Sequence, residues 1–274
     1  MSYRERHRIP NLGVGVGFRT PHYAKVLDER PAMDWFEVIS ENFLVPGGRP
    51  IANLERLRAS YRVVPHGVSL AIGSVEPIDR DYLAKLKALV TRLDPPWFSD
   101  HLCWGRAPGG VHLHDLLPMP YTKEAIAHVV ENVKRVQGTL ERPFALENVS
   151  SYMTHPEDEM PEWAFVTEVI ERADCALLLD VNNVYVSAKN HGFDPEKYVD
   201  TIPADRVVQM HVAGHTDKGT WLLDTHATHV REEVWALHRR ALARTGPVST
   251  LLEWDEDIPP WETLAAEAEK ARAA

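Results

Sequence analysis

Eight short apolar runs along the chain end abruptly in polar residues, and each has the length of a β-strand. Continuous apolar runs of this kind, bounded by turn residues, are typical of strands that are covered on both faces. The runs occupy residues 12–18, 35–42, 61–67, 97–102, 143–150, 175–183, 207–215 and 248–255.

Helix-like segments alternate with these runs. Apolar residues recur at helical spacing in residues 81–93, 123–140, 163–173, 231–245 and 260–274. Alternating strands and helices predict a parallel sheet, and eight parallel strands are the number that closes a (β/α)8 TIM barrel. No linker rich in Gly, Ser or Pro divides the 274 residues, so we expect an α/β fold with a single barrel domain spanning 1–274.

The composition narrows the class of protein. A hydrophobic fraction of 44% and a charged fraction of 26% are ordinary for a globular protein with a sizeable core. The formal net charge of −10 argues against a nucleic-acid partner, because nucleic-acid binders usually carry a basic excess. The sequence shows neither an apolar N-terminal stretch of signal-peptide length nor a membrane-length segment, so we expect a cytoplasmic protein with no membrane partner.

Polar side chains of metal-ligand type stand at the ends of six successive predicted strands. In a (β/α)8 barrel the working face is built from these C-terminal strand ends and from the loops that follow them. In a later loop Asp224 and His226 stand two residues apart and would point the same way if that segment were extended. The strand-end residues are His66, Asp100 with His101, Glu147 with Asn148, Asp180 with Asn183, His211 with His215, and Glu253 with Asp255.

The three acids Glu147, Asp180 and Glu253 carry the argument for metal. A single histidine at a strand end is more often hydrogen-bonded in a core or loop than bound to a metal. Acids that converge on one barrel mouth, however, repel one another, and divalent cations would remove that cost. Imidazole and carboxylate ligands suit iron, manganese or zinc, and the two cysteines lack the spacing of a thiolate site.

The remaining histidines have ordinary explanations. His128 and His238 fall on predicted helices, where we expect them to be solvated. His112 and His114 either line the barrel mouth through a loop or belong to a solvent-facing hairpin.

Several longer motifs resemble one known family. The runs HGVSLAIGS, SDHLCW, LENVSSY, LLLDVNNVYVSAKNHGFD, QMHVAGH, DTHA and LLEWD resemble, in this order, the domain-of-unknown-function 692 family of the xylose-isomerase-like barrel superfamily. Known members of that family are multinuclear non-haem iron oxidoreductases of the kind that act in methanobactin biosynthesis. The resemblance implies a barrel holding two or three iron ions, in mixed Fe(II)/Fe(III) states, with O2 as co-substrate.

The resemblance also implies a substrate, a partner and a ligand set. Known members modify a residue of a ribosomally made precursor peptide, most often cysteine, and many act with a small partner protein that captures the leader. The implied metal ligands are His66, His101, Glu147, Asp180, Asn183, His211, Asp224, His226 and Glu253, with Glu147 expected to bridge two ions.

Further residues are expected around the metal ions. Asp255 would take a proton from a substrate amide or thiol if it lies within hydrogen-bond reach. His215 and Glu41 are the other candidate catalytic residues, and either could act by orienting a metal ligand. The candidate substrate-binding residues are Asn42, Trp104, Asn148 and Tyr152, although plain packing explains Trp104 and Tyr152 equally well.

Three other classes of protein fit part of the pattern. The ligand order also resembles the trinuclear zinc phosphodiesterases of the endonuclease IV type, but Asn183 stands where that family has a histidine. A two-metal sugar isomerase or epimerase would use Glu147, Asp180, His211 and Glu253 and leave the Asp224–His226 pair idle. A metal-binding scaffold without catalytic activity stays open as well.

Overall fold

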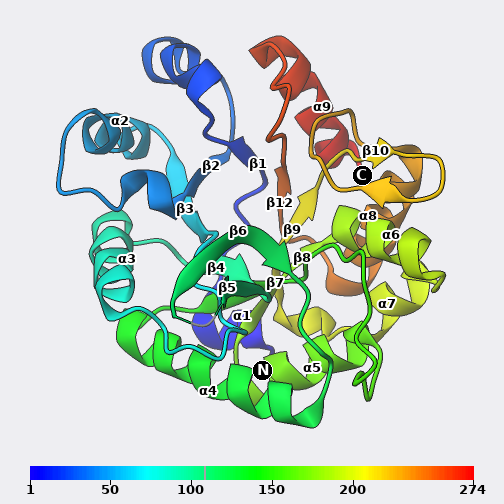
Figure 1. Ribbon diagram of the computed structural model, residues 1–274. Coiled ribbons are helices and arrows are strands. Elements are labelled where there is room, and N and C mark those ends of the chain that lie inside the picture. Colours follow the sequence, from blue (N-terminus) through cyan, green and yellow to red (C-terminus); the bar gives the residue numbers. More distant parts are fainter. Residues whose placement is uncertain (108) are drawn as a thin grey trace.

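A closed barrel of parallel strands forms the centre of the computed structural model, which describes residues 1–107 and 109–274 (Figure 1). The order around the barrel is β1-β12-β9-β8-β7-β4-β3-β2, so it follows the chain and closes where β1 pairs with β12. The barrel strands are β1 (Val14–Gly17), β2 (Trp35–Ile39), β3 (Arg62–Gly67), β4 (Phe98–His101), β7 (Phe144–Glu147), β8 (Ala176–Asp180), β9 (Val207–Val212) and β12 (Ser249–Leu252). The predicted (β/α)8 TIM barrel is thereby confirmed.

Helices surround the barrel and cover the outer face of its strands (Figure 1). The predicted helices are present as α3 (Arg80–Leu93), α4 (Lys123–Leu140), α5 (Glu162–Ala173), α8 (Glu232–Thr245) and α9 (Trp261–Ala273). Four further helices were not predicted from the sequence, namely α1 (Tyr3–His7), α2 (Arg49–Arg58), α6 (Val181–His191) and α7 (Pro195–Thr201). Four short helical turns complete the helical part, namely η1 (Thr20–His22), η2 (Lys25–Glu29), η3 (Ser40–Phe43) and η4 (Ala204–Arg206).

Helix α6 begins directly at the end of β8, where the apolar pattern alone suggested a strand running on to residue 183. The side chain of Asp180 accepts a hydrogen bond from the backbone N–H of Asn183, which caps the new helix. The helix ends at Gly192, which has the left-handed conformation typical of a C-terminal cap. The strand therefore stops at Asp180, and Asn183 lies in the first turn of a helix.

The N-terminal end of the barrel is closed by α1. The side chain of Tyr3 is only 2% exposed and packs with apolar residues inside the barrel, among them Trp35 and Trp97. Arg4 and Arg6 anchor the helix at the rim, because Arg4 donates to the carbonyl of Thr245 and Arg6 pairs with Asp174. The open end of the barrel is thus the C-terminal one.

Two small antiparallel ribbons lie in loops at the C-terminal end. The first consists of β5 (Trp104–Ala107) and β6 (Val111–Leu117), and it arches across the barrel mouth (Figure 1). The second consists of β10 (Thr216–Asp217) and β11 (Leu222–Leu223). Among the described residues, no helix is both long and apolar enough to cross a membrane.

The expectation that His238 is solvated is wrong. The side chain is fully buried between α8 and the barrel, and its Nε2 lies 3.2 Å from the hydroxyl of Thr250. His128 is half-buried, with its Nε2 2.8 Å from the carbonyl oxygen of Ser74. Both histidines face inward because the loops and strands beside their helices supply oxygen atoms for the imidazole.

The burial of His238 predicts a loss of stability in acid. Burial lowers its pKa from 6.5 to about 4. As pH falls through this range the unfolded chain binds a proton before the folded protein does, so the free energy of unfolding decreases. Between about pH 7.5 and pH 5 we expect His238 to account for a loss of about 2 kcal/mol. Urea unfolding of the wild type and of His238→Gln at both pH values measures this contribution, and an identical pH dependence in the two proteins would contradict the assignment.

Candidate metal centre

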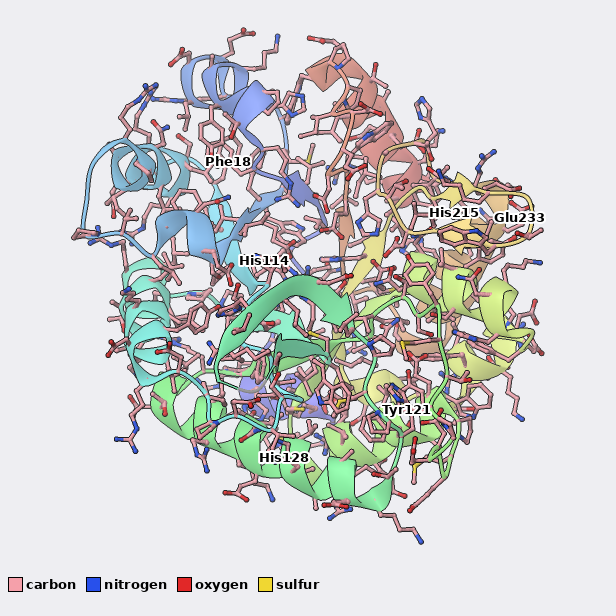
Figure 2. All side chains as sticks on the ribbon, in the orientation of Figure 1. Phe18, His114, Tyr121, His128, His215 and Glu233 are labelled. Carbon is pink, nitrogen blue, oxygen red and sulfur yellow. The ribbon has the colours of Figure 1, made fainter. Side chains whose placement is uncertain are left out.

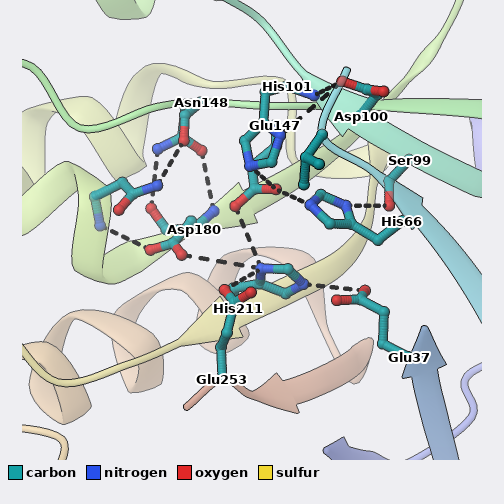
Figure 3. A network of polar contacts seen from close by, with 12 residues as sticks. Glu37, His66, Ser99, Asp100, His101, Glu147, Asn148, Asp180, His211 and Glu253 are labelled. Atoms are coloured by element: carbon teal, nitrogen blue, oxygen red, sulfur yellow. Dashed lines mark hydrogen bonds and ion pairs between the residues drawn. The ribbon is translucent and has the colours of Figure 1, made fainter. Parts of the chain in front are cut away.

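The candidate ligands converge at the C-terminal ends of the barrel strands (Figure 3). Three overlapping groups of side chains have ligand atoms within 4.8 Å of one another. The first group contains His66, His101 and Glu147, the second contains Glu147, Asp180, His211 and Glu253, and the third contains His226, Glu253 and Asp255. Glu147 and Glu253 each belong to two groups, so the three groups form one continuous cluster.

The first group joins β3, β4 and β7. Oε2 of Glu147 lies 3.5 Å from Nε2 of His66 and 3.4 Å from Nε2 of His101. The other ring nitrogen of His66 lies 2.9 Å from the hydroxyl of Ser99, which orients the ring. Burial lowers the pKa of His66 well below its ordinary value, and the adjacent His101 lowers it further, so His66 is a neutral imidazole suited to bind a metal ion.

The second group is centred on His211 of β9. Its Nδ1 lies 3.0 Å from Oε2 of Glu253, 3.3 Å from Oε1 of Glu147 and 4.0 Å from Oδ2 of Asp180. Burial raises the pKa of Asp180 well above its ordinary value, and the neighbouring Glu147 raises it further despite nearby histidines. Three carboxylates are thus buried around one imidazole nitrogen.

The third group lies where the loop after β11 meets the end of β12. Nδ1 of His226 lies 3.2 Å from Oε2 of Glu253 and 3.5 Å from Oδ2 of Asp255. Nε2 of the same ring lies 2.7 Å from Oδ1 of Asp224. The segment is not extended, because His226 has a left-handed backbone with φ of 46°, yet this turn brings the Asp224 and His226 side chains into contact.

Unsatisfied oxygen atoms show that this cluster fits metal ions. Oε2 of Glu147, Oδ2 of Asp180 and Oδ1 of Asn183 are buried and accept no hydrogen bond from the described residues. A buried polar atom without a partner is costly, and a cation removes the cost. Imidazole, carboxylate and amide donors together match iron, manganese or zinc. These residues could therefore hold two or three such ions.

Glu37 lies behind His211 and is not among the residues predicted from the sequence. Oε2 of Glu37 is 3.2 Å from Nε2 of His211 (Figure 3). The same oxygen accepts a hydrogen bond of 2.6 Å from Gln209. Gln209 in turn accepts from the indole N–H of Trp97 at 2.8 Å. A carboxylate that accepts a hydrogen bond from one ring nitrogen of a histidine fixes the tautomer of that histidine. The other ring nitrogen is then free to bind a metal ion. Glu37 sits in the middle of the apolar run 35–42, and an acid inside such a run was the available signal.

Asn148 supports the cluster from within the barrel wall. Its side-chain amide donates to the carbonyl of Asp180 at 2.9 Å, and its side-chain oxygen accepts from the N–H of Asp180 at 3.0 Å. The carbonyl of Asn148 accepts from the side chain of Asn183 at 3.0 Å. Because both amide atoms are engaged, we propose a supporting role for Asn148 in place of the predicted substrate contact.

His215 lies outside the three groups, on the side of α6 and α8 where Glu233 also lies (Figure 2). Its Nδ1 lies 2.8 Å from the side-chain oxygen of Asn182, whose amide donates to Asp224 at 2.7 Å. Its ring stacks on Tyr185 in a separate cleft of about 390 Å³. Among the described residues, His215 is linked to the candidate ligand Asp224 through Asn182.

Glu41 also lies outside the groups. Its Oε1 accepts hydrogen bonds from the hydroxyl of Tyr82 at 2.7 Å and from the N–H of Val68 at 2.9 Å. Burial raises the pKa of the neighbouring Asp100 well above its ordinary value, and Glu41 raises it further. Glu41 and Asp100 therefore form an acidic pair beside His101, and Asn42 is exposed at the rim.

A cleft of about 610 Å³ opens beside Asn183 and Asp224. Tyr152 and Trp221 line it, and their rings meet edge to face at 5.7 Å. Trp104 is half-buried against the core, as expected if its role is packing. His112 and His114 belong to the β5–β6 hairpin and line a neighbouring cleft. Figure 2 shows His114 on the ribbon that crosses the mouth.

The exposed apolar side chains are not scattered over the surface. Among the described residues, every exposed large hydrophobic residue except Met1 lies in a loop that follows the C-terminal end of a barrel strand. They are Val45, Val68, Val75, Val111, Leu113, Tyr152, Met153 and Trp221. These side chains therefore lie at the same end of the barrel as the candidate metal centre.

Fold and site together define a TIM-barrel protein with a candidate multinuclear metal centre at its open end. Residues 13–274 match the family described as RiPP precursor modification enzyme MbnB/TglH/ChrH, and the chain belongs to this family of enzymes.

Two UPF0276 proteins are similar to this chain over most of its length. A UPF0276 protein of Anaeromyxobacter sp. (strain Fw109-5) is 55% identical over 260 residues, covering 95% of this chain and 92% of the relative. A UPF0276 protein of Caulobacter vibrioides (strain NA1000 / CB15N) is 52% identical over 265 residues, covering 96% and 94%.

Solved structures with the same fold are more distant. D-psicose 3-epimerase from Clostridium cellulolyticum superimposes with a TM-score of 0.65 at 13% identity, covering 95% of this chain and 97% of the epimerase. Endonuclease IV from Thermus thermophilus gives a TM-score of 0.62 at 17% identity, covering 96% and 98%. At this identity the likeness concerns the fold alone, and it agrees with the predicted superfamily.

The sharing of Glu147 by two groups predicts the effect of its removal. Glu147→Gln keeps the size of the side chain but loses the charge and the second acceptor oxygen, so we expect at least one equivalent of bound metal to be lost. Elemental analysis of the purified variant measures this. Glu157→Gln, on an exposed residue in the loop after the same strand, is the matched control. Full metal content in Glu147→Gln would contradict a bridging role.

Proposed function

We propose that this protein is a multinuclear non-haem iron enzyme that uses O2 to oxidise a cysteine residue of a ribosomally made precursor peptide. The observation that carries the proposal is the sharing of Glu147 and Glu253 between neighbouring groups, which makes the cluster suited to several metal ions at once. Membership of a family of RiPP precursor modification enzymes supports the peptide substrate.

The donor set is compatible with iron, as it is with manganese and zinc. The chain's own thiols, Cys103 and Cys175, are buried and belong to none of the three groups, which leaves imidazoles, carboxylates and one amide. Iron in such a site supplies Lewis-acid activation of a substrate thiol and the electrons for reaction with O2. Asn183 is a neutral and weak donor, so its position suits an ion that must exchange a ligand for substrate.

The residues around the cluster would position the substrate. The cleft beside Asn183 and Asp224 has space for a peptide side chain, with Tyr152 and Trp221 as apolar walls. Asp255 is the most exposed acid of the three groups, with 38% of its side chain accessible. We propose that Asp255 accepts a proton from the substrate. The apolar loop residues around the mouth would bind the rest of the peptide or a small partner protein that captures its leader.

Anaerobic purification followed by elemental analysis and Mössbauer spectroscopy of iron-57-loaded protein tests the proposal. We expect at least two irons per chain, with a mixed-valence population that reacts with O2. Incubation with a cysteine-containing precursor peptide should then give an O2-dependent mass change in that peptide.

Two controls make the outcome decisive. Asp180→Asn, which removes one buried carboxylate of the second group, should lower iron content and abolish the mass change, whereas the exposed Glu157→Gln should change neither. Stoichiometric zinc, cleavage of DNA and no response to O2 would overturn the proposal in favour of the phosphodiesterase class.

A further inference from the structure

A chain of buried polar side chains leads from His211 through the inside of the barrel to Trp97. Trp97 directly precedes β4, and its indole Nε1 donates to Oε1 of Gln209 at 2.8 Å. Nε2 of Gln209 lies 2.6 Å from Oε2 of Glu37 and 2.7 Å from Nε2 of His211. None of the four side chains is more than 1% exposed, so each must find its hydrogen-bond partners within the chain.

The amide of Gln209 stands in a place where packing alone would favour an apolar side chain. Gln209 and His211 are two residues apart on β9, so both side chains lie on the same face of the strand. The barrel interior beside Trp97 is apolar and includes Trp35 and Leu178. An amide buried in such surroundings costs free energy that an apolar residue would avoid. Gln209 therefore has a role beyond packing.

Trp97 fixes the orientation of this amide. An indole N–H can only donate a hydrogen bond, so the atom of Gln209 that faces it must be the side-chain oxygen. The amide nitrogen consequently faces Glu37 and His211. An amide rotated by half a turn would place its oxygen beside the carboxylate of Glu37, where two acceptors repel. The same oxygen would compete with Glu37 for the ring N–H of His211.

Glu37 in turn depends on Gln209. Oε2 of Glu37 contacts Gln209 and His211, whereas its Oε1 has no hydrogen-bond partner among the described residues. Nε2 of His211 thus has a donor, Gln209, and an acceptor, Glu37, within reach. The ring proton can therefore lie on either nitrogen without leaving Nε2 unsatisfied. When Nδ1 binds a metal ion the proton must lie on Nε2, and Glu37 is then its acceptor.

We propose that Trp97 is a positioning residue for His211. Its indole N–H holds the amide of Gln209 in the orientation that lets Glu37 accept the ring proton when Nδ1 of His211 binds a metal ion. The inference rests on the metal centre of the proposed function, but not on the identity of the metal, on O2 or on the peptide.

Competition between the protein and a chromophoric chelator for Zn²⁺ tests this inference without O2 or substrate. Trp97→Phe keeps an aromatic ring but loses the N–H, so at least one Zn²⁺ should bind roughly tenfold more weakly. Gln209→Leu should weaken the same ion by a similar factor. Because Trp97 acts through Gln209, the double variant Trp97→Phe/Gln209→Leu should bind Zn²⁺ within about twofold of Gln209→Leu.

Trp235→Phe is the matched control, because it alters a buried indole of α8 whose N–H has no partner among the described residues. Its Zn²⁺ affinity should equal that of the wild type, and circular dichroism checks that each variant is folded. Equal Zn²⁺ affinity of Trp97→Phe and the wild type overturns the role of Trp97. A double variant that loses the product of the two single losses also overturns it, because the two residues would then act independently.

NMR of the wild type labelled with ¹⁵N-histidine keeps the inference testable if Trp97→Phe does not fold. With saturating Zn²⁺ the ring of His211 should carry its proton on Nε2, where it is identified by its proximity to the side-chain amide of Gln209. A ring proton on Nδ1 under these conditions overturns the inference. If the wild type binds no Zn²⁺, the proposed metal centre fails together with this inference, whereas unchanged Zn²⁺ binding in the variants refutes the inference alone.

Discussion

The burial of several carboxylates around one imidazole is the constraint on which the rest of the structure depends. Glu37, Glu147, Asp180 and Glu253 are each at most 6% exposed and approach His211 from different strands of the barrel. An ionised carboxylate outside water is stable only with a partner, so the barrel mouth must supply cations. Within the described residues the histidines and Arg19 lie within ion-pair distance of these acids, and the candidate metal ions would supply the remaining positive charge.

The same residues that form the candidate metal centre also determine local structure. Asp180 uses one oxygen to cap α6 and leaves the other buried without a hydrogen-bond partner among the described residues. Asn148 holds the backbone of Asp180 and the side chain of Asn183 together. The position of α6 and the geometry of the second group are therefore set by one small set of hydrogen bonds.

Much of the fold follows from the sequence because a parallel barrel repeats a simple pattern. Each strand is an apolar run that ends in a polar residue, and the C-terminal ends must meet at one rim, so the convergence of His66, Glu147 and Asp180 could be predicted. Helix α6 could not be predicted, because its first residues directly follow the polar end of β8. The cap by Asp180 marks where the helix begins and the left-handed Gly192 marks where it ends. Arg19 and Glu37 were missed because their partners lie far away in sequence, Asp255 in the loop after β12 and His211 on β9.

The distribution of exposed apolar residues has a consequence for how this kind of protein can diversify. The apolar residues that are exposed beyond Met1 belong, within the described part of the chain, to the loops after the strands. The barrel interior and most of the cluster belong to the strands and their ends, with His226 in the loop after β11 as the exception. Loop substitutions can alter what docks at the mouth without disturbing barrel packing or the candidate ligands. Duplicated copies of such a gene could thus acquire new peptide substrates through changes in the surface loops, while the candidate metal centre stays unchanged.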